Sequence, residues 1–402
     1  MNDTPMAQRV NRIKPSPSTA AAQRVRELKA QGHEILDLTV GEPDFDTPEH
    51  VKLAAIEAIQ RGDTKYTPVN GIPELRTAIS DKLFQQHGVR YASEQITVGG
   101  GAKQVIFLAL MATVDEGSEV VIPAPYWVSY PDMVLANGGT PVIVECTEAS
   151  GFKLTAQQLE SAITTRTRWI ILNAPSNPTG AAYTSAELRS LADVLLAHPH
   201  VRVLTDEIYD EIWYGPGRAD TLVGVEPRLR DRVLVTNGVS KTYAMTGWRI
   251  GYGAGATDLA AAINKLQSQS SSCPSSVSQA AAVAALTGKQ DFVADTVAVY
   301  QTRRDKALQA LNDLPGISCT TPQGGFYLFV NCAALLGKHT PQGAVIDTDE
   351  EFASYLLESQ QVAVIHGAAY GTPGYVRISF ATTSTVLDEA IARIGRACAA
   401  LS

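Results

Sequence analysis

The sequence predicts an α/β protein built on a mainly parallel sheet, with a second, smaller α+β unit. Short runs rich in β-branched and other apolar residues recur between helical patterns, at 118–125, 168–175, 201–207 and 232–240. Strands that alternate with helices are typical of a parallel sheet with crossover helices. Ligands bind beyond the carboxyl ends of such strands, so the polar, aromatic and Gly/Pro-rich residues that end these runs are expected to form one site.

The second unit is predicted from a change of pattern near residue 300. A long charged helix is expected at 298–314, followed by the runs GGFYLFVNC and GYVRISFAT and by an amphipathic helix that ends at Ser402. The helix and strand expected before residue 49 precede the first elements of the large sheet. We therefore predict a large domain at 49–298 and a small domain formed by 1–48 and 299–402.

Composition narrows the class of protein. The 402 residues are 45% hydrophobic and 18% charged, as in a globular enzyme rather than a disordered chain. The net charge of −8 comes without a long basic run, which argues against binding to nucleic acid or to an anionic membrane. The N-terminal stretch lacks the apolar core of a signal peptide, and no run approaches the length of a membrane span. A cytoplasmic location is expected.

Metal and disulfide chemistry are not indicated. Five cysteines are an odd number, and they are widely scattered without a C-x-x-C pair, which fits neither a disulfide framework nor a zinc ribbon. His198 and His200 lie beside a proline and away from other ligand types. No metal site is expected.

The stretch SKTYAMTGWRIGY, residues 240–252, places Lys241 directly after a predicted strand. A lysine on a loop is most often a solvated surface residue. When desolvated, however, a lysine readily loses its proton and attacks carbonyl groups to form a Schiff base. The residues that end the other strands favour this second interpretation.

Asp206 ends the strand at 201–207, and Tyr209 follows three residues later. A carboxylate at such a position can keep a pyridinium nitrogen protonated, as pyridoxal phosphate requires, although an aspartate after a strand is more often a helix N-cap. Asn177 in NAPSNPTG lies in an Asn-Pro turn that can present its amide to a ligand. Trp127 in APYWVSY can stack on a flat ring, although an isolated tryptophan is more often part of the core.

Two features suggest anion binding. In TVGGGAKQ, Gly101, Ala102 and Lys103 begin a helix after a strand, where backbone N–H groups can hold a phosphate. The run matches neither the dinucleotide fingerprint nor the Walker loop. Arg249 can add a bidentate contact to the same phosphate. Arg377 lies in an apolar strand, where an unpaired charge is costly and a substrate carboxylate would relieve the cost.

In combination, these motifs resemble the class I, fold-type I pyridoxal-phosphate aminotransferases, in the branch of aspartate aminotransferases. Nearly the whole chain takes part in the resemblance, through motifs that appear in family order: LTVGEPDFDTPEHV, KYTPVNGIPELR, PAPYWVSYPDM, NAPSNPTGAAY, TDEIYDE, SKTYAMTGWRIGY and VRISFAT. The resemblance implies a large domain with a mainly parallel seven-stranded sheet, a smaller α+β domain, pyridoxal 5'-phosphate as cofactor and a homodimer with shared sites.

The resemblance also implies residue roles. Lys241 would bond the cofactor aldehyde as an aldimine and later shuttle a proton, in a ping-pong reaction between amino acids and 2-oxo acids. Asp206 would pair with the ring nitrogen, Asn177 and Tyr209 with the ring oxygen, and Trp127 would stack on the ring. The residues implied around the phosphate are Gly101, Ala102, Lys103, Ser240, Arg249 and, from a second subunit, Tyr66.

Arg377 would bind the α-carboxylate of the substrate, with Gly41, Trp127 and Asn177 beside it. Dicarboxylate aminotransferases that are better known read the distal carboxylate with an arginine after the lysine motif. This chain has no arginine between Arg249 and Arg303. Lys14 in RIKPSPST is the expected substitute, because similar relatives that use aspartate, glutamate and prephenate place a basic residue there; a solvated lysine is the alternative.

The prediction is therefore an aspartate-type aminotransferase with glutamate or 2-oxoglutarate as the other partner. Prephenate, aromatic or alanine-like substrates remain open, because specificity depends on scattered contacts. A lyase with the same cofactor is a further alternative. A metabolite-sensing regulator would need a DNA-binding extension, and the chain before KPSPST is too short for one.

Overall fold

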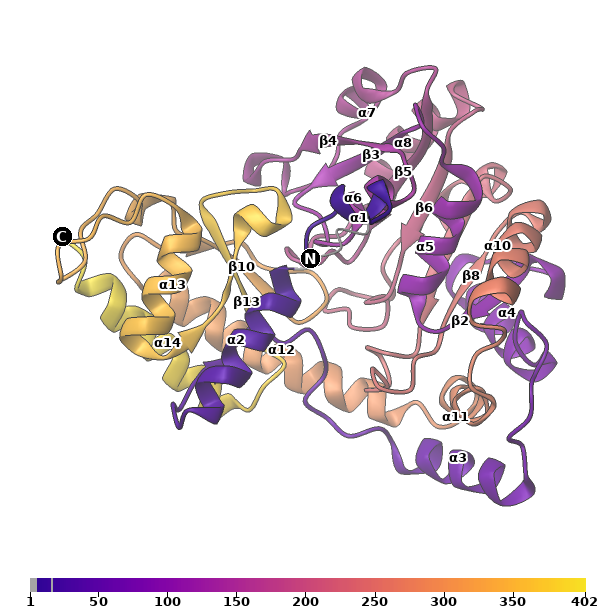
Figure 1. Cartoon of the computed structure of the whole chain (residues 1–402), viewed down its shortest axis with the longest axis horizontal. Helices are drawn as coiled ribbons and strands as arrows, with labels where there is room; N and C mark the ends of the chain where they lie inside the picture. Colours follow the sequence, from indigo (N-terminus) through magenta and orange to yellow (C-terminus); the bar gives the residue numbers. More distant parts are fainter. Residues whose placement is uncertain (1–5, 16) are drawn as a thin grey trace.

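The structure is a computed structural model that describes residues 6–15 and 17–402. Residues 1–5 and 16, which belong to the predicted small domain, lie outside the described part. The chain folds around a seven-stranded sheet on one side and a smaller sheet on the other (Figure 1). The predicted fold class is confirmed.

The large sheet has the strand order β2-β8-β7-β6-β5-β3-β4, and only β8 runs antiparallel to its neighbours. The four runs predicted as strands form β3, β5, β6 and β7. Their residues are almost all buried, as expected for strands covered on both faces. The strand bounds are Ile96–Gly99 (β2), Glu119–Ala124 (β3), Thr140–Glu145 (β4), Thr167–Asn173 (β5), Arg202–Asp206 (β6), Val233–Gly238 (β7) and Gly251–Ala254 (β8).

Helices pack on both faces of this sheet (Figure 1). One face is covered by α3 (Glu49–Arg61), α4 (Pro73–His87), α8 (Ser185–Ala197) and α11 (Ser276–Thr287). The other face is covered by α5 (Ala102–Thr113), α6 (Tyr130–Ala136) and α10 (Thr257–Ser270). Two separate apolar layers therefore hold the sheet, and the carboxyl ends of its parallel strands are left for a site.

The second unit contains an antiparallel sheet of the order β12-β13-β10-β9. Its strands are β9 (Ser318–Cys319), β10 (Tyr327–Asn331), β12 (Ile365–His366) and β13 (Tyr375–Ser379). The N-terminal segment joins this unit through β1 (Leu36–Asp37), which pairs in parallel with β11 (Val362–Ala363). The helices α13 (Asp349–Gln360) and α14 (Ser384–Ala399) share its apolar core.

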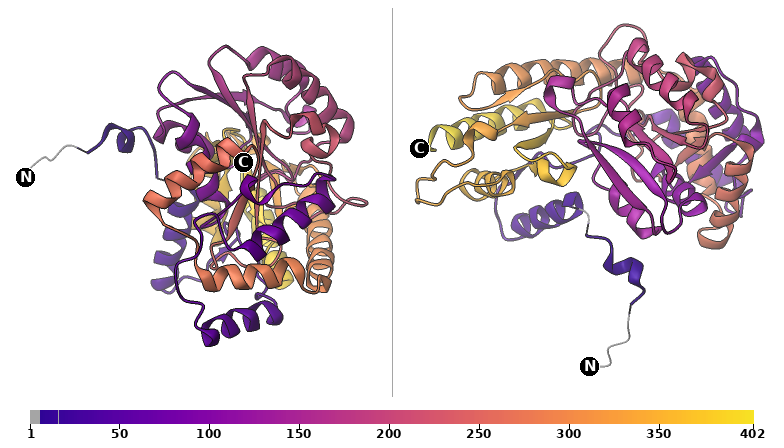
Figure 2. Two further views of the ribbon diagram at one scale, coloured as in Figure 1. Left: turned by 90° about the vertical axis from the view of Figure 1, so that its right-hand side faces the viewer. Right: turned by 90° about the horizontal axis from the view of Figure 1, so that it is seen from above.

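Helix α12 (Asp291–Asn312) links the two cores. Val293 near its start packs in the core of the large sheet, whereas Leu311 near its end packs in the core of the small unit. It lies side by side with α14 (Figure 2) and runs across the predicted boundary between residues 298 and 299. The short helices α1 (Gln8–Asn11), α7 (Ala156–Ala162) and α9 (Leu222–Val225) and the longer α2 (Pro17–Ala30) complete the helices of the described chain.

No helix among the described residues is long and apolar enough to cross a membrane. All five cysteines are free thiols, and four of them are buried.

Candidate active site

A cavity of about 330 Å³ opens beyond the carboxyl ends of the parallel strands. Four of these strands contribute through residues at or after their ends, as the sequence predicts: Trp127 after β3, Asn177 after β5, Asp206 at the end of β6 with Tyr209 after it, and Lys241 after β7. Arg377 enters from β13 of the small sheet, so the cavity lies between the two units.

Lys241 is a partly buried amine that lines this cavity. Its Nζ donates a hydrogen bond to the carbonyl of Gly41, in the segment that connects the small unit to α3. Burial lowers the pKa of Lys241 to about 8; Glu42 opposes the shift, and Arg249 adds to it. A lysine with this pKa is neutral in a substantial fraction of molecules near neutral pH, which makes it a competent nucleophile and base.

Asp206 is a buried carboxylate whose two oxygens are both held in place. The hydroxyl of Tyr130 donates to Oδ2 at 2.7 Å, and the N–H of Ile208 donates to Oδ1 at 3.3 Å. Burial raises the pKa of Asp206 to about 6, while these two hydrogen bonds act in the opposite direction. A cation placed against Asp206 would therefore lower its proton affinity and be stabilised itself.

Tyr209 lies in the turn after β6, and its hydroxyl is 3.0 Å from the hydroxyl of Tyr327. Burial raises the pKa of Tyr209 well above its usual value, and its neighbour Tyr327 adds to the shift. The Tyr209 hydroxyl therefore remains protonated and is available to donate a hydrogen bond.

Arg377 is positioned to receive a carboxylate. Its Nη1 donates to Asn177 Oδ1 at 3.1 Å and its Nη2 to the carbonyl of Thr39 at 2.6 Å, while the ring of Tyr327 lies 4.3 Å from its central carbon. Its Nε is buried and has no hydrogen-bond partner among the described residues. A buried guanidinium with an unpaired N–H and no carboxylate partner favours an anionic ligand.

The start of α5 forms the second anion-binding part of the cavity, with Gly101, Ala102, Lys103, Ser240 and Arg249 along its wall. The Arg249 guanidinium donates to the carbonyl of Gly100 at 3.0 Å. A Cβ atom at Gly101 would lie 2.3 Å from Nη2 of Arg249, and Gly101 has φ +94°. Only glycine fits there, which leaves the N–H groups at the helix start accessible.

The cavity brings together every predicted site residue except two. Lys14 lines a neighbouring cavity of about 730 Å³, which borders the first one at Thr39, and its backbone N–H donates to Asp132 Oδ1 at 3.2 Å. Tyr66 is 90% exposed and lies at a separate surface pocket. Within a single chain, then, neither side chain contributes to the cavity of Lys241.

Tyr130 and Tyr327, which contact Asp206 and Tyr209, are among the residues of this cavity that sequence reasoning missed. Tyr130 belongs to the same YWVSY run as Trp127, three residues later, and that spacing on one helical turn is a signal that points to the same site. Tyr327 lies in an almost fully buried strand, β10, where nothing distinguishes it from a core residue.

The residues present fit pyridoxal phosphate. The partly buried amine of Lys241 suits its aldehyde, the buried carboxylate of Asp206 suits a protonated ring nitrogen, and Lys103 and Arg249 beside the start of α5 suit the phosphate. The cations that line the cavity outnumber the carboxylates, which matches a ligand and a substrate that both carry negative charge.

Comparisons with known proteins agree with this chemistry. Residues 33–394 match the model of the family described as aminotransferase class I and II. The chain is 53% identical over 98% of its length to a probable aspartate/prephenate aminotransferase of Rhizobium leguminosarum bv. phaseoli, of which 99% is covered.

Solved structures give the same result. The aspartate aminotransferase from Rhizobium meliloti is 50% identical, with a TM-score of 0.96 over 99% of this chain and 100% of the other. The aspartate aminotransferase from Thermus thermophilus with maleate is 38% identical, with a TM-score of 0.90 over 98% of this chain and 99% of the other. Motifs, cavity and comparisons agree, and the chain belongs to the class I and II aminotransferases, a family that depends on pyridoxal phosphate.

Proposed function

We propose that this aminotransferase moves the amino group of L-aspartate or L-glutamate to 2-oxoglutarate or oxaloacetate. The observation that carries the proposal is the meeting of three groups in one cavity: the partly buried amine of Lys241, the buried carboxylate of Asp206 and the Arg377 guanidinium with its unpaired Nε. A nucleophile, a partner for a ring nitrogen and a receptor for a carboxylate are the groups that transamination requires.

Pyridoxal phosphate, when bound, supplies the aldehyde that accepts the amino group and the ring that withdraws electrons from the α-carbon of the substrate. We assign Lys241 to the aldehyde, Asp206 to the ring nitrogen, and Asn177 and Tyr209 to the ring oxygen. Trp127 is assigned to the face of the ring. The residues assigned to the phosphate are Gly101, Ala102, Lys103, Ser240 and Arg249.

Arg377 is assigned to the α-carboxylate, with Asn177 and the backbone at Gly41 beside it. Its side chain is fixed by two hydrogen bonds and by the Tyr327 ring, so the entropy lost on binding is small. With the cofactor bound, Lys241 Nζ would be the group of this chain that takes the α-proton from the substrate and returns it. A pKa of about 8 lets Lys241 both accept and return that proton.

We propose that Lys14 reads the distal carboxylate of a dicarboxylic substrate. The cavity that Lys14 lines borders the active-site cavity at Thr39, which supports this role if the N-terminal segment moves toward the substrate. Replacing Lys14 with alanine should then raise the apparent KM for aspartate far more than the apparent KM for alanine. An equal effect on both would remove Lys14 from the site.

Prephenate is a second candidate substrate for the same site. The Rhizobium leguminosarum relative is named a probable aspartate/prephenate aminotransferase and is 53% identical to this chain. Prephenate also carries two carboxylates, so Arg377 and Lys14 are expected to serve both substrates.

We further propose that the enzyme is a homodimer in which Tyr66 of one subunit contacts the phosphate bound by the other. This tyrosine is 90% exposed in the single chain, and helix α3 nearby exposes Leu53, Ile56 and Ile59, which supports a partner surface there. The free thiols are consistent with the reducing cytoplasm, where we expect the enzyme to work.

The variant Lys241→Ala tests the proposed nucleophile. We expect turnover to fall by at least about 1000-fold, because the other amine that lines the cavity, Lys103, lies over the Trp127 ring and is assigned to the phosphate, while cofactor binding through the phosphate contacts is partly retained. Turnover would be measured in a coupled assay, and cofactor binding by equilibrium dialysis. A fully active Lys241→Ala variant would contradict the assignment.

A further inference from the structure

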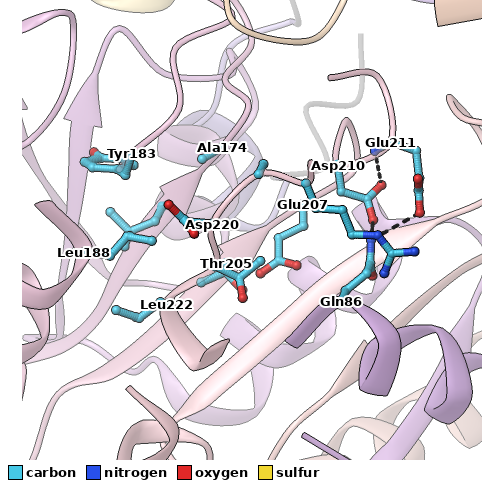
Figure 3. Close-up of a pocket in the computed structure, with 14 residues that line it drawn as sticks. Gln86, Ala174, Tyr183, Leu188, Thr205, Glu207, Asp210, Glu211, Asp220 and Leu222 are labelled. Atoms are coloured by element: carbon cyan, nitrogen blue, oxygen red, sulfur yellow. Dashed lines mark hydrogen bonds between the residues drawn. The ribbon is translucent and has the colours of Figure 1, made fainter. Parts of the chain in front are cut away.

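The turn that follows β6 has two faces. Asp206 and Tyr209 line the active-site cavity. The three acidic residues between and after them, Glu207, Asp210 and Glu211, line a different cavity (Figure 3), which shares no lining residue with the first. One face of the turn therefore carries groups of the cofactor site, and the other face carries three carboxylates that the proposed reaction does not use.

These three carboxylates bind the C-terminal part of α4. Lys82 Nζ lies 2.7 Å from Glu211 Oε1 and 3.2 Å from Asp210 Oδ2. Gln86 Nε2 donates to Asp210 Oδ2, as Figure 3 shows, and His87 Nε2 lies 2.8 Å from Glu207 Oε2. From β7, Asn237 Nδ2 donates to Asp210 Oδ2 at 2.8 Å.

Ile208 and Tyr209 pack into the apolar core of the small unit, whereas the acidic residues of the same turn are held by these polar contacts. The space beneath the turn is a cavity of about 30 Å³ lined by Thr205, Glu207, Asp210 and Asp220 among others, not a packed layer. A void gives the residues around it fewer dispersion contacts, so on this side the position of the turn depends on its ionic and hydrogen-bonded partners.

Lys82 is the centre of this cluster. Its side chain is 10% exposed, and those of Asp210 and Glu211 are 7% and 28% exposed. Burial alone would lower the pKa of Lys82, but Asp210 and Glu211 raise it well above its usual value, so Lys82 is a cation. Without this cation, two neighbouring carboxylates would face each other with little solvent to screen them.

We propose that Lys82 is a positioning residue of the cofactor site. It fixes the turn 206–211 against α4 and so holds Asp206 and Tyr209 at the places from which they contact the cofactor ring. Lys82 does not touch the cofactor, because it lies on the far side of the turn from the active-site cavity. The inference rests on the ring contacts proposed above for Asp206 and Tyr209.

The proposal predicts a specific kinetic pattern for Lys82→Met. Displacing Asp206 and Tyr209 by a fraction of an ångström should lower kcat by about 10- to 100-fold. The apparent KM for aspartate should stay within about twofold, because Arg377 and its partners lie on other elements. The pH midpoint of the absorption band of the bound cofactor should rise, because the ring oxygen loses the hydrogen bond expected from Tyr209.

Two variants control for general damage to the fold. Lys153→Met removes a lysine of the same large unit that pairs with Glu187 Oε1 at 2.6 Å and does not contact the turn. It should leave kcat and the pH midpoint unchanged. Lys82→Arg keeps the cation and should restore kcat to within about fivefold of the wild type. If Lys82→Met does not fold, Glu211→Gln should show the same pattern more weakly.

The experiment measures kcat, KM, the pH midpoint of the cofactor band and the melting temperature of the cofactor-free protein for all variants. A Lys82→Met enzyme with wild-type kcat and an unchanged midpoint overturns the proposal. So does a variant whose melting temperature and KM change while the midpoint does not, because that pattern reports damage to stability alone. If the proposed function is wrong, the result differs, because the wild-type protein itself would then show no absorption band of bound pyridoxal phosphate.

Discussion

At the scale of single residues, the burial of Asp206 in the cavity lowers the free energy of unfolding. The carboxylate is buried, its pKa is raised to about 6 in the protein without cofactor, and an unfolded aspartate titrates near 3.8. Between these two values the folded state binds more protons than the unfolded state, so stability falls as pH rises through this window. Above about pH 7 the full penalty is present, of the order of 3 kcal/mol.

Replacing Asp206 with asparagine should therefore stabilise the cofactor-free protein at pH 8 and stabilise it much less at pH 4.5. Urea denaturation at the two pH values measures the difference. Asp258→Asn, which removes a carboxylate that is 73% exposed, is the control. A gain that is the same at both pH values would contradict the burial argument. The same variant should lose most of its turnover, because the anion proposed for the ring nitrogen is gone.

At the scale of elements, β8 packs closely against the start of α5, where we propose that the phosphate binds. A Cβ atom on Gly251 would lie 2.0 Å from the backbone nitrogen of Ala102 and 2.4 Å from the carbonyl carbon of Gly101. Gly251 pairs with Gly99 on β2 and Gly238 on β7, so the strand cannot move away without breaking the sheet. The position of the α5 N–H groups thus depends on a glycine in a neighbouring strand.

Gly251→Ala should push the start of α5 out of place and raise the dissociation constant of pyridoxal phosphate about tenfold or more. Gly247→Ala is the matched control, because a Cβ atom there meets nothing within 4 Å. Fluorescence titration of the cofactor-free variants gives both constants. Equal affinities for the two variants would show that the contact between β8 and α5 does not shape the phosphate site.

Some strands could be predicted from the sequence, and others could not. Strands β3, β5, β6 and β7 were predictable because each is a continuous apolar run that ends in polar or Gly/Pro-rich residues. Strand β8, with the sequence GYGA, was not predicted, because its glycines disfavour a strand and pairing with β2 and β7 imposes it. Edge strand β4 alternates exposed and partly buried residues and was also missed.

For the site, residues that follow strands were predictable, whereas residues that depend on distant contacts were not. Tyr130 acquires its role from Asp206, 76 positions away, and Lys82 from Glu211, 129 positions away. Neither contact leaves a local pattern in the sequence. Periodicity and motif spacing describe neighbours along the chain, and these pairs are neighbours only after folding.

At the scale of the whole molecule, the shared-site proposal makes a prediction about mixed dimers. Lys241→Ala and Tyr66→Ala should each be impaired as homodimers. In a mixed dimer, the site with Lys241 from one chain would receive Tyr66 from the other, so one native site would form. Co-refolding or co-expressing the two differently tagged variants and purifying the mixed species should recover up to half of the wild-type activity per dimer.

Sedimentation analysis of the same samples checks that they are dimers. Lys241→Ala mixed with wild-type chains provides the reference, because that dimer also holds one native site. A mixed dimer of the two variants with no more activity than the Tyr66→Ala homodimer would place Tyr66 outside the partner's site.

We propose that the enzyme transaminates dicarboxylic amino acids through a cofactor bound to Lys241. The most direct test is the visible absorption spectrum of the purified protein with pyridoxal phosphate, before and after adding L-aspartate, L-glutamate, L-alanine or L-phenylalanine. Aspartate and glutamate should convert the bound cofactor to its pyridoxamine form, and alanine and phenylalanine should convert far less of it. Conversion mainly with alanine or phenylalanine would contradict the substrate class, and the absence of conversion with all four would contradict transamination itself.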